Sequence, residues 1–384
     1  MSKIKIAFLT PEYPHPAVKH SAGIGTSIKN LVLELVKKNL EVSVFVYQQK
    51  ENKIIEDNGV KIHLIASKSY PFLGWFLYRQ YLNNYINKYI SEDDIDCIEA
   101  PDWTGITAFM KFKIPLVIRF HGSDTYFCKI ENRPQKRKNF WFEKLAIKKA
   151  QGYISPTKFA GATSAQLFGL KPEQIKTIHY GLQLENFTNQ NPEQYNTNQL
   201  LYIGTIIRKK GVLELAEIFN IVISKNPDAK LTLIGSDAFD ISTQSASTYK
   251  LFEDKLTSQA KKQTKYLGKV PYIEVQNQIK KAHICVFPSF AETLGMVTIE
   301  SMALQKPVVN TNIGWAKELI DDKKNGFLVH PKNIDQYADK ILKLLDDKKL
   351  CLKIGKAARQ KVESTFDISK IAQENIDYYK RLID

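Results

Sequence analysis

Short apolar runs rich in β-branched residues alternate with longer amphipathic stretches, and this alternation limits the possible folds more than any other feature of the sequence. Strand-like runs occupy residues 4–9, 42–46 and 116–120, and helix-like stretches occupy residues 25–38 and 78–90. A rhythm of strand, helix and strand is typical of a mostly parallel sheet covered by helices on both faces. The sequence therefore predicts a doubly wound α/β fold.

Residues 188–198 separate two such patterns. They read TNQNPEQYNTN, with one aromatic and no aliphatic side chain, which is typical of a linker between domains. A chain of 384 residues also exceeds what one hydrophobic core usually serves. We predict an N-terminal domain over 1–188, a C-terminal domain over 189–365, and a final helix over 366–384 that packs back on the first domain. Because open α/β sheets bind ligands beyond the carboxyl ends of their strands, we expect both domains to face one cleft.

The composition favours a globular protein with anionic partners. Hydrophobic residues make up 43% of the chain and the formal net charge is +15, which favours nucleotide phosphates, anionic lipids and nucleic acid. No recognisable module supports a nucleic-acid partner. The four cysteines lie far apart without zinc-binding spacing, so we expect buried thiols and no bound metal. Neither a signal-peptide core nor an uncharged stretch of about 18 residues is present, from which we expect a cytoplasmic protein.

Positive charge is concentrated between residues 133 and 149. Seven lysines and arginines lie there with a single acid, Glu143, around the aromatic run 140–142. One interpretation is the solvated face of a helix whose apolar side enters the core. The alternative is a surface that docks on the anionic inner leaflet of a membrane, to which the aromatic run 70–76 could contribute.

The loop after the first strand ends in Gly23-Ile24-Gly25, directly before an amphipathic stretch. Small residues here let backbone N–H groups and a helix N-terminus approach a phosphate or a sugar. A dinucleotide-binding fingerprint fits less well, because the loop is too long, Ile28 replaces the third glycine and no ribose-binding acid follows the second strand. A flexible loop without a ligand is a further alternative.

His121 follows the apolar run 115–120 and is followed by Gly122, Ser123 and Asp124. An imidazole at the carboxyl end of a strand is well placed to contact a ligand hydroxyl. A Ser/His/Asp hydrolase fits less well, because neighbours in sequence rarely form a triad and the chain has no G-x-S-x-G sequence. A structural histidine is the remaining alternative.

Gly204 and Thr205 open a loop after the run 200–203, and the loop continues through Arg208 and Lys210 to a second glycine before the next helix. Cations between glycines at a helix start can clamp a diphosphate, since they add charge-assisted hydrogen bonds to the field of the helix dipole. The residue order is not that of a P-loop. A solvated basic turn is the alternative.

Glu292 and Glu300, with seven residues between them, lie in the segment FPSFAETLGMVTIESMA at 287–303. A buried strand is predicted to end before them, and a helix is predicted to begin near Met296. A carboxylate accepts two hydroxyl hydrogens, which suits a ribose diol and a sugar hydroxyl. Paired acids also occur in glycosidases, but the phosphate-binding features around them argue against that activity. The predicted donor contacts here are Thr293, Leu294, Gly295, Met296 and Val297.

With these motifs the sequence resembles the retaining glycosyltransferases of the GT-B fold, and among them family 4. The likeness covers nearly the whole chain and rests on Glu292 and Glu300 in their setting, on the Gly204 loop, on His121, on the Gly23–Gly25 loop and on the sequence IHYGLQLENF at 178–187. It implies two Rossmann-like domains that face a cleft.

Matched residue by residue, the resemblance implies that Glu300 binds the nucleotide ribose, that Glu292 contacts the transferred sugar, and that Lys210 neutralises the leaving diphosphate. It implies that His121 contacts the donor sugar and that the Gly23–Gly25 loop lies against the diphosphate.

The resemblance further implies retention of anomeric configuration and catalysis without a metal ion, with Lys210 and Arg208 supplying the positive charge. Thr205 stands where the family usually has arginine, and Gln183 stands where it has aspartate. We expect a UDP-sugar as the donor, with a GDP-sugar as the alternative. The acceptor would be a glycan or a lipid-linked molecule in surface polysaccharide or glycoconjugate synthesis. A protein that only binds a sugar nucleotide, or a basic peripheral membrane protein, remains the alternative function.

Overall fold

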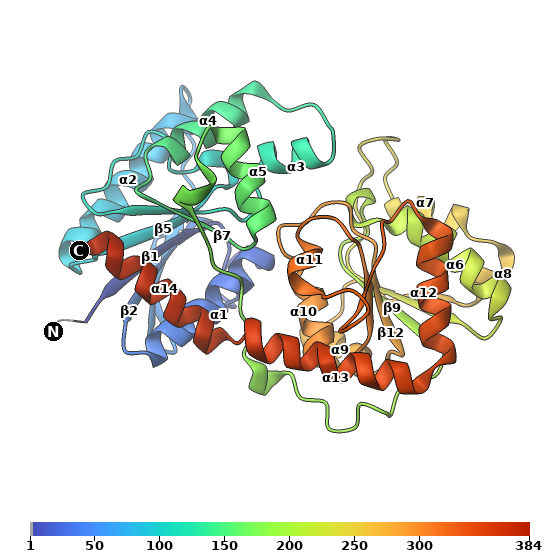
Figure 1. The fold of residues 1–384 in the computed structure, drawn as a ribbon. Coiled ribbons are helices and arrows are strands. Elements are labelled where there is room, and N and C mark those ends of the chain that lie inside the picture. Colours follow the sequence, from blue (N-terminus) through green and yellow to red (C-terminus); the bar gives the residue numbers. More distant parts are fainter. Residues whose placement is uncertain (1–2) are drawn as a thin grey trace. The chain divides into compact units, whose positions relative to one another are not determined.

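The computed structural model describes residues 3–384, which form two compact units. Unit 1 extends to Gln183 and takes up the chain again at Asp367, and unit 2 is Leu184–Phe366. In each unit, helices cover both faces of a mainly parallel sheet (Figure 1). The predicted domain limits at residues 188 and 366 lie within a few residues of these boundaries.

Unit 1 contains an eight-stranded sheet in the order β3-β4-β2-β1-β5-β6-β7-β8. Neighbouring strands are parallel except for the pair β3 and β4, which is antiparallel. The edge strand β3 reads KIIED and is largely exposed, so it lacks the apolar run by which the other strands were predicted. The strands are β1 (Lys5–Thr10), β2 (Glu41–Gln49), β3 (Lys53–Asp57), β4 (Val60–Ala66), β5 (Cys97–Pro101), β6 (Leu116–Arg119), β7 (Gly152–Ser155) and β8 (Ile175–Thr177).

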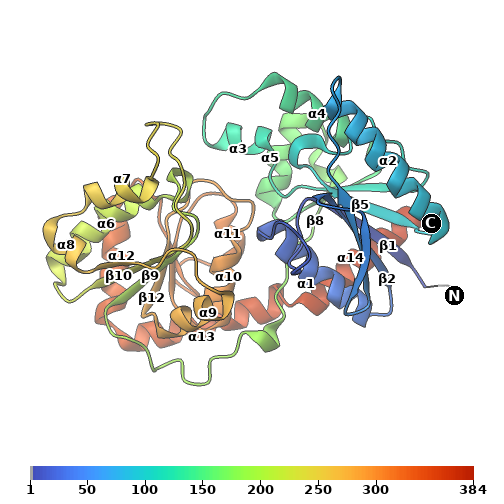
Figure 2. The same cartoon turned by 180° about the vertical axis from the view of Figure 1, so that it is seen from behind.

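Both faces of this sheet are buried under helices. Successive side chains of a strand point to opposite faces, so each strand contributes to both cores. Ile6 and Phe8 of β1 pack with α1 and α14, whereas Ala7 and Leu9 belong to the core under α2, α4 and α5. The views in Figures 1 and 2 both show α1 and α14 side by side. The helices of unit 1 are α1 (Gly23–Lys37), α2 (Gly74–Glu92), α3 (Asp124–Ile130), α4 (Arg137–Lys148), α5 (Lys158–Phe168) and α14 (Ile368–Ile383), with a 3-10 turn η1 (Trp103–Gly105).

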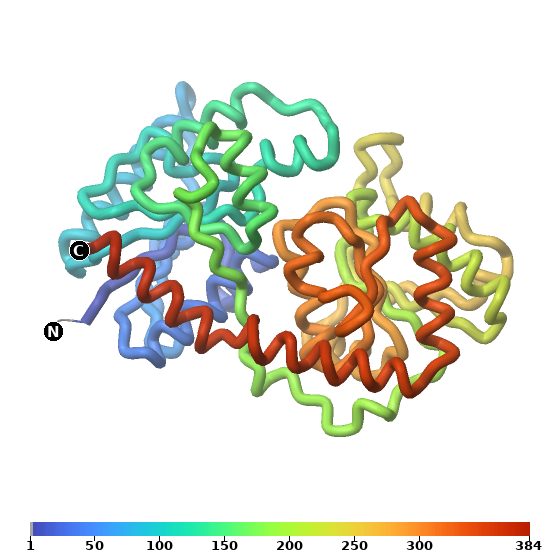
Figure 3. The backbone as a smooth tube through the Cα atoms, in the orientation of Figure 1, coloured from blue at the N-terminus to red at the C-terminus, as the bar shows by residue number. Residues whose placement is uncertain are grey.

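Helix α14 belongs to unit 1 although it follows unit 2 in the sequence (Figure 3). Arg119 and Glu99, both nearly inaccessible, form a two-pronged ion pair at 2.7 and 2.8 Å. From α14, the Tyr379 hydroxyl donates to Glu99 Oε2 at 2.7 Å, and the Asn375 side-chain oxygen accepts from Arg119. The helix thus completes the hydrogen bonding of two charges buried in unit 1.

Unit 2 contains a six-stranded, wholly parallel sheet in the order β11-β10-β9-β12-β13-β14. Its strands are β9 (Gln199–Ile203), β10 (Lys230–Ile234), β11 (Thr264–Tyr266), β12 (Ile284–Phe287), β13 (Val308–Asn310) and β14 (Phe327–Leu328). Its helices are α6 (Val212–Lys225), α7 (Thr248–Lys255), α8 (Ser258–Lys262), α9 (Tyr272–Lys281), α10 (Met296–Ala303), α11 (Ala316–Leu319), α12 (Ile334–Asp346) and α13 (Lys348–Thr365), with a 3-10 turn η4 (Arg208–Lys210).

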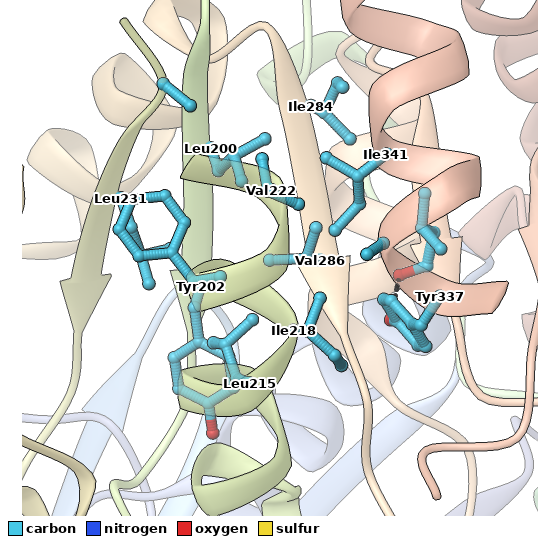
Figure 4. Close-up of a cluster of buried hydrophobic side chains, with 14 of the residues drawn as sticks. Leu200, Tyr202, Leu215, Ile218, Val222, Leu231, Ile284, Val286, Tyr337 and Ile341 are labelled. Atoms are coloured by element: carbon cyan, nitrogen blue, oxygen red, sulfur yellow. Dashed lines mark hydrogen bonds between the residues drawn. The ribbon is translucent and has the colours of Figure 1, made fainter. Parts of the chain in front are cut away.

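One face of this second sheet forms an apolar core with α6 and α12. Figure 4 shows Leu200 and Val286 of the strands beside Val222 of α6 and Ile341 of α12, all fully buried. Burying each such side chain contributes about 1.5–3 kcal/mol. The Tyr337 hydroxyl in this cluster donates a hydrogen bond to the Val309 carbonyl at 2.6 Å, drawn as a dashed line in Figure 4.

The strand orders confirm two doubly wound, Rossmann-like domains, as predicted. The order reverses between β1 and β5 in unit 1 and between β9 and β12 in unit 2. Loops that leave neighbouring strands in opposite directions separate at such a switch point and leave a crevice for ligands. No helix among residues 3–384 is long and apolar enough to cross a membrane. The four cysteines are buried and unpaired.

Candidate active site

Lys210 and Glu292 meet at the switch point of unit 2. Lys210 ends the loop that follows β9, Glu292 lies in the loop that follows β12, and the lysine Nζ hydrogen-bonds to the glutamate Oε1. Their side chains are 22% and 17% exposed, so the ion pair is only partly screened by water. The two loops are also joined through their backbones, since the Phe290 N–H donates to the Lys209 carbonyl at 2.8 Å.

A glycine is needed where these loops approach most closely. Gly211 has a φ of +70°, and a Cβ on it would lie 1.8 Å from the carbonyl oxygen of Pro288. Any side chain would therefore push the loop that carries Lys210 away from the loop that carries Glu292. The second glycine of the predicted clamp thus sets its geometry.

The N-terminus of α10 adjoins this ion pair. The helix begins at Met296, after Gly295 with a φ of +94°, and a small pocket is lined by Lys210, Glu292, Gly295 and Val297 together with Trp315. The N–H groups of a first helical turn have no partner within the helix and carry the positive end of its dipole. Such a pocket suits an anion, and the N–H groups predicted to bind phosphate belong to the loop and the helix start that line it. Thr293 and Leu294, which precede the glycine, are buried.

Glu300 lies one turn further along α10 and is 7% exposed. The Tyr272 hydroxyl at the start of α9 donates to Glu300 Oε1 at 2.7 Å. Burial raises the pKa of the Glu300 carboxyl, and the hydrogen bond from Tyr272 opposes that rise. Tyr272 was not predicted, because nothing in its local sequence connects it with Glu300 on another helix.

Arg208 has a partner that the sequence did not indicate. Its guanidinium donates to both carboxylate oxygens of Asp240, from Nε at 2.9 Å and from Nη2 at 2.8 Å. Asp240 is 2% exposed, and the hydrogen bond from Arg208 lowers the pKa of its carboxyl to about 2. Two of the five N–H groups of Arg208 are therefore occupied, which orients the guanidinium and leaves the others for a phosphate.

Gly204 and Thr205 begin the same loop with unusual backbone geometry. Gly204 has a φ of +152°, and a Cβ on Gly235 would lie only 1.9 Å from its carbonyl oxygen. Thr205 is exposed, and its carbonyl accepts from the buried Tyr202 hydroxyl at 3.1 Å. Two glycines thus allow the turns after β9 and β10 to touch.

In unit 1, an acid occupies the helix start where the sequence predicted a ligand. The Gly25 N–H in the first turn of α1 donates to Glu12 Oε1 at 2.8 Å. A Cβ on Gly25 would lie 2.9 Å from the Glu12 carbonyl oxygen, so the glycine allows this contact, whereas Gly23 has open space around it. Glu12 was not predicted. Its carboxylate accepts the hydrogen bond that the Gly25 N–H could otherwise donate to a phosphate.

His121 lies just beyond β6 and is 8% exposed. The backbone N–H of His121 donates to Asp102 Oδ1 at 2.9 Å. The imidazole Nδ1 lies 2.6 Å from the Tyr180 hydroxyl. Burial, aided by the positive charge of Arg119, lowers the pKa of the imidazole to about 3, so His121 is neutral at physiological pH. Asp102 and Tyr180 were not predicted.

Two family models match the chain. The model described as Glycosyl transferases group 1 matches residues 184–361, and the model described as Glycosyltransferase Family 4 matches residues 21–186. The chain belongs to the group 1, family 4 glycosyltransferases.

Relatives of this glycosyltransferase include an uncharacterized glycosyltransferase of Methanocaldococcus jannaschii, 24% identical over 98% of both chains. The capsular polysaccharide biosynthesis glycosyltransferase CapM of Staphylococcus aureus is 30% identical over 53% of each chain. Among solved structures, sucrose-phosphate synthase from Thermosynechococcus elongatus has a TM-score of 0.79 at 18% identity over 99% of both chains. Anabaena HepE in complex with UDP has a TM-score of 0.75 at 19% identity over 99% of this chain and 100% of that one. These likenesses confirm the fold.

The predicted site residues of the glycosyltransferase divide between its two units. Unit 2 brings together Lys210, Glu292 and the start of α10, and it holds Arg208 and Glu300 by partners from other loops and helices. Gly23, Gly25 and His121 belong to unit 1. Their roles toward a donor remain predictions.

The hydrolase alternative for His121 finds no support in the geometry around it. The Ser123 hydroxyl caps α3 by accepting from the Tyr126 N–H at 3.1 Å, and Asp124 pairs with Arg133 at 2.8 Å. Both side chains that would complete a triad have structural partners instead.

The basic segment 133–149 of this glycosyltransferase consists largely of α4, which has one buried side and one side in solvent. Glu143 is buried and accepts from the N–H groups of Asp124 and Thr125 at 2.9 and 3.1 Å. On the other side, Trp141 is 56% exposed, and Lys144 lies 5.9 Å from its ring centre. The helix therefore has an anchored face and a basic, aromatic face in solvent.

Proposed function

We propose that the protein transfers a sugar from a UDP-sugar to a glycan or lipid-linked acceptor, with retention of anomeric configuration and without a metal ion. The observation that carries the proposal is the Lys210–Glu292 ion pair at the switch point of unit 2, beside the start of α10. Family membership supports the transfer of a sugar, and the pocket supplies groups of the chemistry that a sugar nucleotide needs.

The donor diphosphate would bind at the N-terminus of α10. There its negative charge meets N–H groups and the helix dipole, and Lys210 exchanges its bond to Glu292 for a bond to phosphate. Glu292, released from the lysine, accepts a hydroxyl of the transferred sugar. Glu300, held by Tyr272, accepts the ribose hydroxyls.

In the transfer step, the bond between the sugar C1 and the diphosphate oxygen breaks, and its electron pair stays on that oxygen. The acceptor oxygen forms the new bond to C1 on the same face, and its proton passes to the departing phosphate. Lys210 and Arg208 stabilise the charge that develops on the diphosphate, which is the contribution that a metal ion makes elsewhere.

Two relatives support the choice of substrates. Solved structures of Anabaena HepE contain UDP and UDP-glucose, which favours a UDP-sugar over a GDP-sugar. CapM of Staphylococcus aureus acts in capsular polysaccharide biosynthesis according to its name, which favours an acceptor of surface polysaccharide synthesis.

A panel of UDP- and GDP-sugars tests the donor by thermal shift in the presence of EDTA. We expect UDP and one or a few UDP-sugars to raise the melting temperature, and Lys210→Ala to lose most of this shift and most donor turnover. The anomeric coupling of the product, followed by NMR from the first turnover, tests retention. Binding that requires Mg²⁺, or a first product of inverted configuration, contradicts the proposal; nucleotide binding without any turnover indicates a silent binding protein.

We also propose that the segment 133–149 contacts an anionic membrane at the inner face, because lysines and the exposed Trp141 share one face of α4. Co-sedimentation with anionic vesicles at physiological salt tests this contact. Binding that survives in a Lys138→Glu/Lys144→Glu variant, or that is absent in the wild type, leaves only the solvated helix face.

A further inference from the structure

Unit 1 contains a cavity to which the proposed function assigns no role. It has a volume of about 380 Å³ and lies at the carboxyl edge of the sheet, which is the edge where open α/β domains bind ligands. Gln48 near the end of β2, Ser67 and Lys68 after β4, and two tryptophans, Trp75 and Trp103, line it. The volume falls within the range of about 300–1,000 Å³ that small-molecule sites occupy.

The first turns of α2 hold the walls of this cavity in place. Gln48 has a φ of +62°, and its N–H donates to the Tyr78 hydroxyl at 3.0 Å. Thr104, a β-branched residue with a φ of +58°, has its carbonyl bonded to Arg79 Nη2 at 3.2 Å. Left-handed backbone at non-glycine residues is costly and persists where surrounding contacts enforce it, which is common around ligand sites.

Arg79 binds this scaffold through its two terminal nitrogens. It is 7% exposed, donates to the Trp75 carbonyl at 2.9 Å and to the Gly105 carbonyl at 3.3 Å, and lies 4.6 Å from the centre of the Phe142 ring. One side chain thus ties both tryptophan-bearing segments together. The cavity is therefore a preorganised feature of the fold.

The lining has the chemistry of a carbohydrate site. Trp75 and Trp103 are 36% and 42% exposed, although tryptophan is on average a highly buried residue. A pyranose ring presents C–H groups on its faces, which pack on an aromatic ring, and hydroxyls on its edge, which need hydrogen-bond partners. Gln48, Ser67 and Lys68 supply such partners beside the indoles, whereas an acyl chain would leave them unpaired.

The cavity is also connected to the His121 loop. Trp103 directly follows Asp102, whose buried carboxylate accepts the His121 N–H at 2.9 Å. The segment that carries one wall of the cavity therefore also positions the histidine that the sequence predicts to contact the donor sugar.

We propose that this cavity is a subsite for a non-reacting sugar ring of the acceptor, so that the acceptor is an oligosaccharide or a lipid-linked glycan of at least two sugars. The inference rests on the proposed glycosyl transfer. Trp75 and Trp103 pack on the faces of the ring, and Gln48, Ser67 and Lys68 bind its hydroxyls.

The four tryptophans of the chain give a direct test by fluorine NMR of protein labelled with 5-fluorotryptophan. Trp75 and Trp103 report on the cavity, the exposed Trp141 reports on α4, and the buried Trp315 lines the pocket of Lys210 and Glu292. Single Trp→Phe variants assign the four resonances. The probes are UDP, a panel of methyl glycosides and of α- and β-linked oligosaccharides with two to five sugars, and short-chain anionic lipid vesicles.

We expect oligosaccharides of the panel to shift the Trp75 and Trp103 resonances in a saturable manner and to leave Trp141 unchanged, whereas UDP shifts Trp315. No saturable shift at Trp75 and Trp103 with any glycan, or a shift there only with vesicles, overturns the subsite. The Trp315 response separates this failure from a failure of the proposed function, because the latter predicts a UDP response whatever the cavity binds.

Kinetics with a glycan that binds provide the second test. We expect Trp103→Ala to raise the KM for that acceptor at least tenfold, with little change in the UDP Kd or in the rate of donor hydrolysis. Trp103→Tyr, which retains an aromatic face, should restore most of the loss. Leu77→Ala is the control, since Leu77 is 38% exposed on α2, the helix that carries Trp75, but does not line the cavity. An equal effect of Trp103→Ala and Leu77→Ala overturns the proposal.

Discussion

Replacing Glu292 by glutamine should change nucleotide binding and sugar transfer in opposite directions. In the unliganded site Glu292 holds the Lys210 ammonium, so a donor diphosphate must compete with the carboxylate for that cation. Glutamine keeps the shape of the side chain and removes its charge. The substitution therefore makes Lys210 more available to phosphate and also removes one negative charge that repels the nucleotide.

The size of the effect follows from the exposure of the two side chains. At 22% and 17% exposure the pair lies between an exposed ion pair, which contributes about 0.2–1 kcal/mol, and a buried one, whose disruption costs about 3–5 kcal/mol. We take about 1 kcal/mol, which corresponds to a roughly fivefold tighter Kd for UDP. The transfer rate should fall about a hundredfold or more, because an oriented charge beside the reacting sugar is lost.

Isothermal titration of UDP in EDTA, combined with initial rates at saturating donor, measures both effects. Glu193→Gln, at an exposed position of unit 2, controls for the change in net charge. Glu300→Gln is the opposing case, because loss of the ribose acceptor should weaken UDP binding. If Glu292→Gln weakens UDP binding as much as Glu300→Gln does, Glu292 contacts the nucleotide, and its assignment to the sugar is wrong.

Three further predictions follow from single contacts. Tyr272→Phe removes the hydrogen bond that opposes the raised pKa of Glu300, so the acid limb of the pH profile of kcat/KM for the donor should move to higher pH; an unmoved limb contradicts the assignment. Burial lowers the pKa of His63 to about 4. Below about pH 6.5 the unfolded state therefore binds a proton that the folded state does not, and the free energy of unfolding decreases as the pH falls from about 6.5 towards 4. His63→Phe should therefore gain about 2 kcal/mol relative to the wild type between pH 7 and pH 5 in urea unfolding, and parallel pH dependences would refute this. Gly211→Ala should lower the free energy of unfolding in urea by about 3 kcal/mol or more, because it combines a strained φ with a steric overlap. Gly268→Ala, at a φ of +65° with open space around it, should lower it by about 1 kcal/mol. Equal losses would refute the steric argument.

The sequence was sufficient to predict the sheets because buried parallel strands are continuous apolar runs. Strands such as β2 and β12 are buried along nearly their whole length, and their pattern needs no tertiary context. The exposed edge strand β3 lacks this pattern and was missed. Helix α13 was also missed: it contains Gly355, whose place in a helix makes sense only because a Cβ there would lie 2.2 Å from the Gln305 carbonyl oxygen.

For the candidate site, residues that belong to motifs could be predicted, whereas residues that only the fold brings to the site could not. Lys210 and Glu292 could be assigned to one site in advance because each follows a strand at the same edge of one sheet, but their ion pair was not predicted. Tyr272, Asp240 and Glu12 each contact a predicted site residue from 13 to 32 positions away in the chain. Their own local sequences contain no signal of those contacts.

The return of α14 to unit 1 has a consequence for how the protein is made. Unit 2 is one continuous segment, whereas unit 1 requires residues from both sides of it. During translation the second unit is therefore complete on the ribosome before the first. Until α14 is synthesised, the Arg119–Glu99 pair lacks its hydrogen-bond partners Asn375 and Tyr379. A nascent chain arrested before α14 should present a folded C-terminal unit and an unfinished N-terminal one, reversing the usual order in which domains mature along a polypeptide.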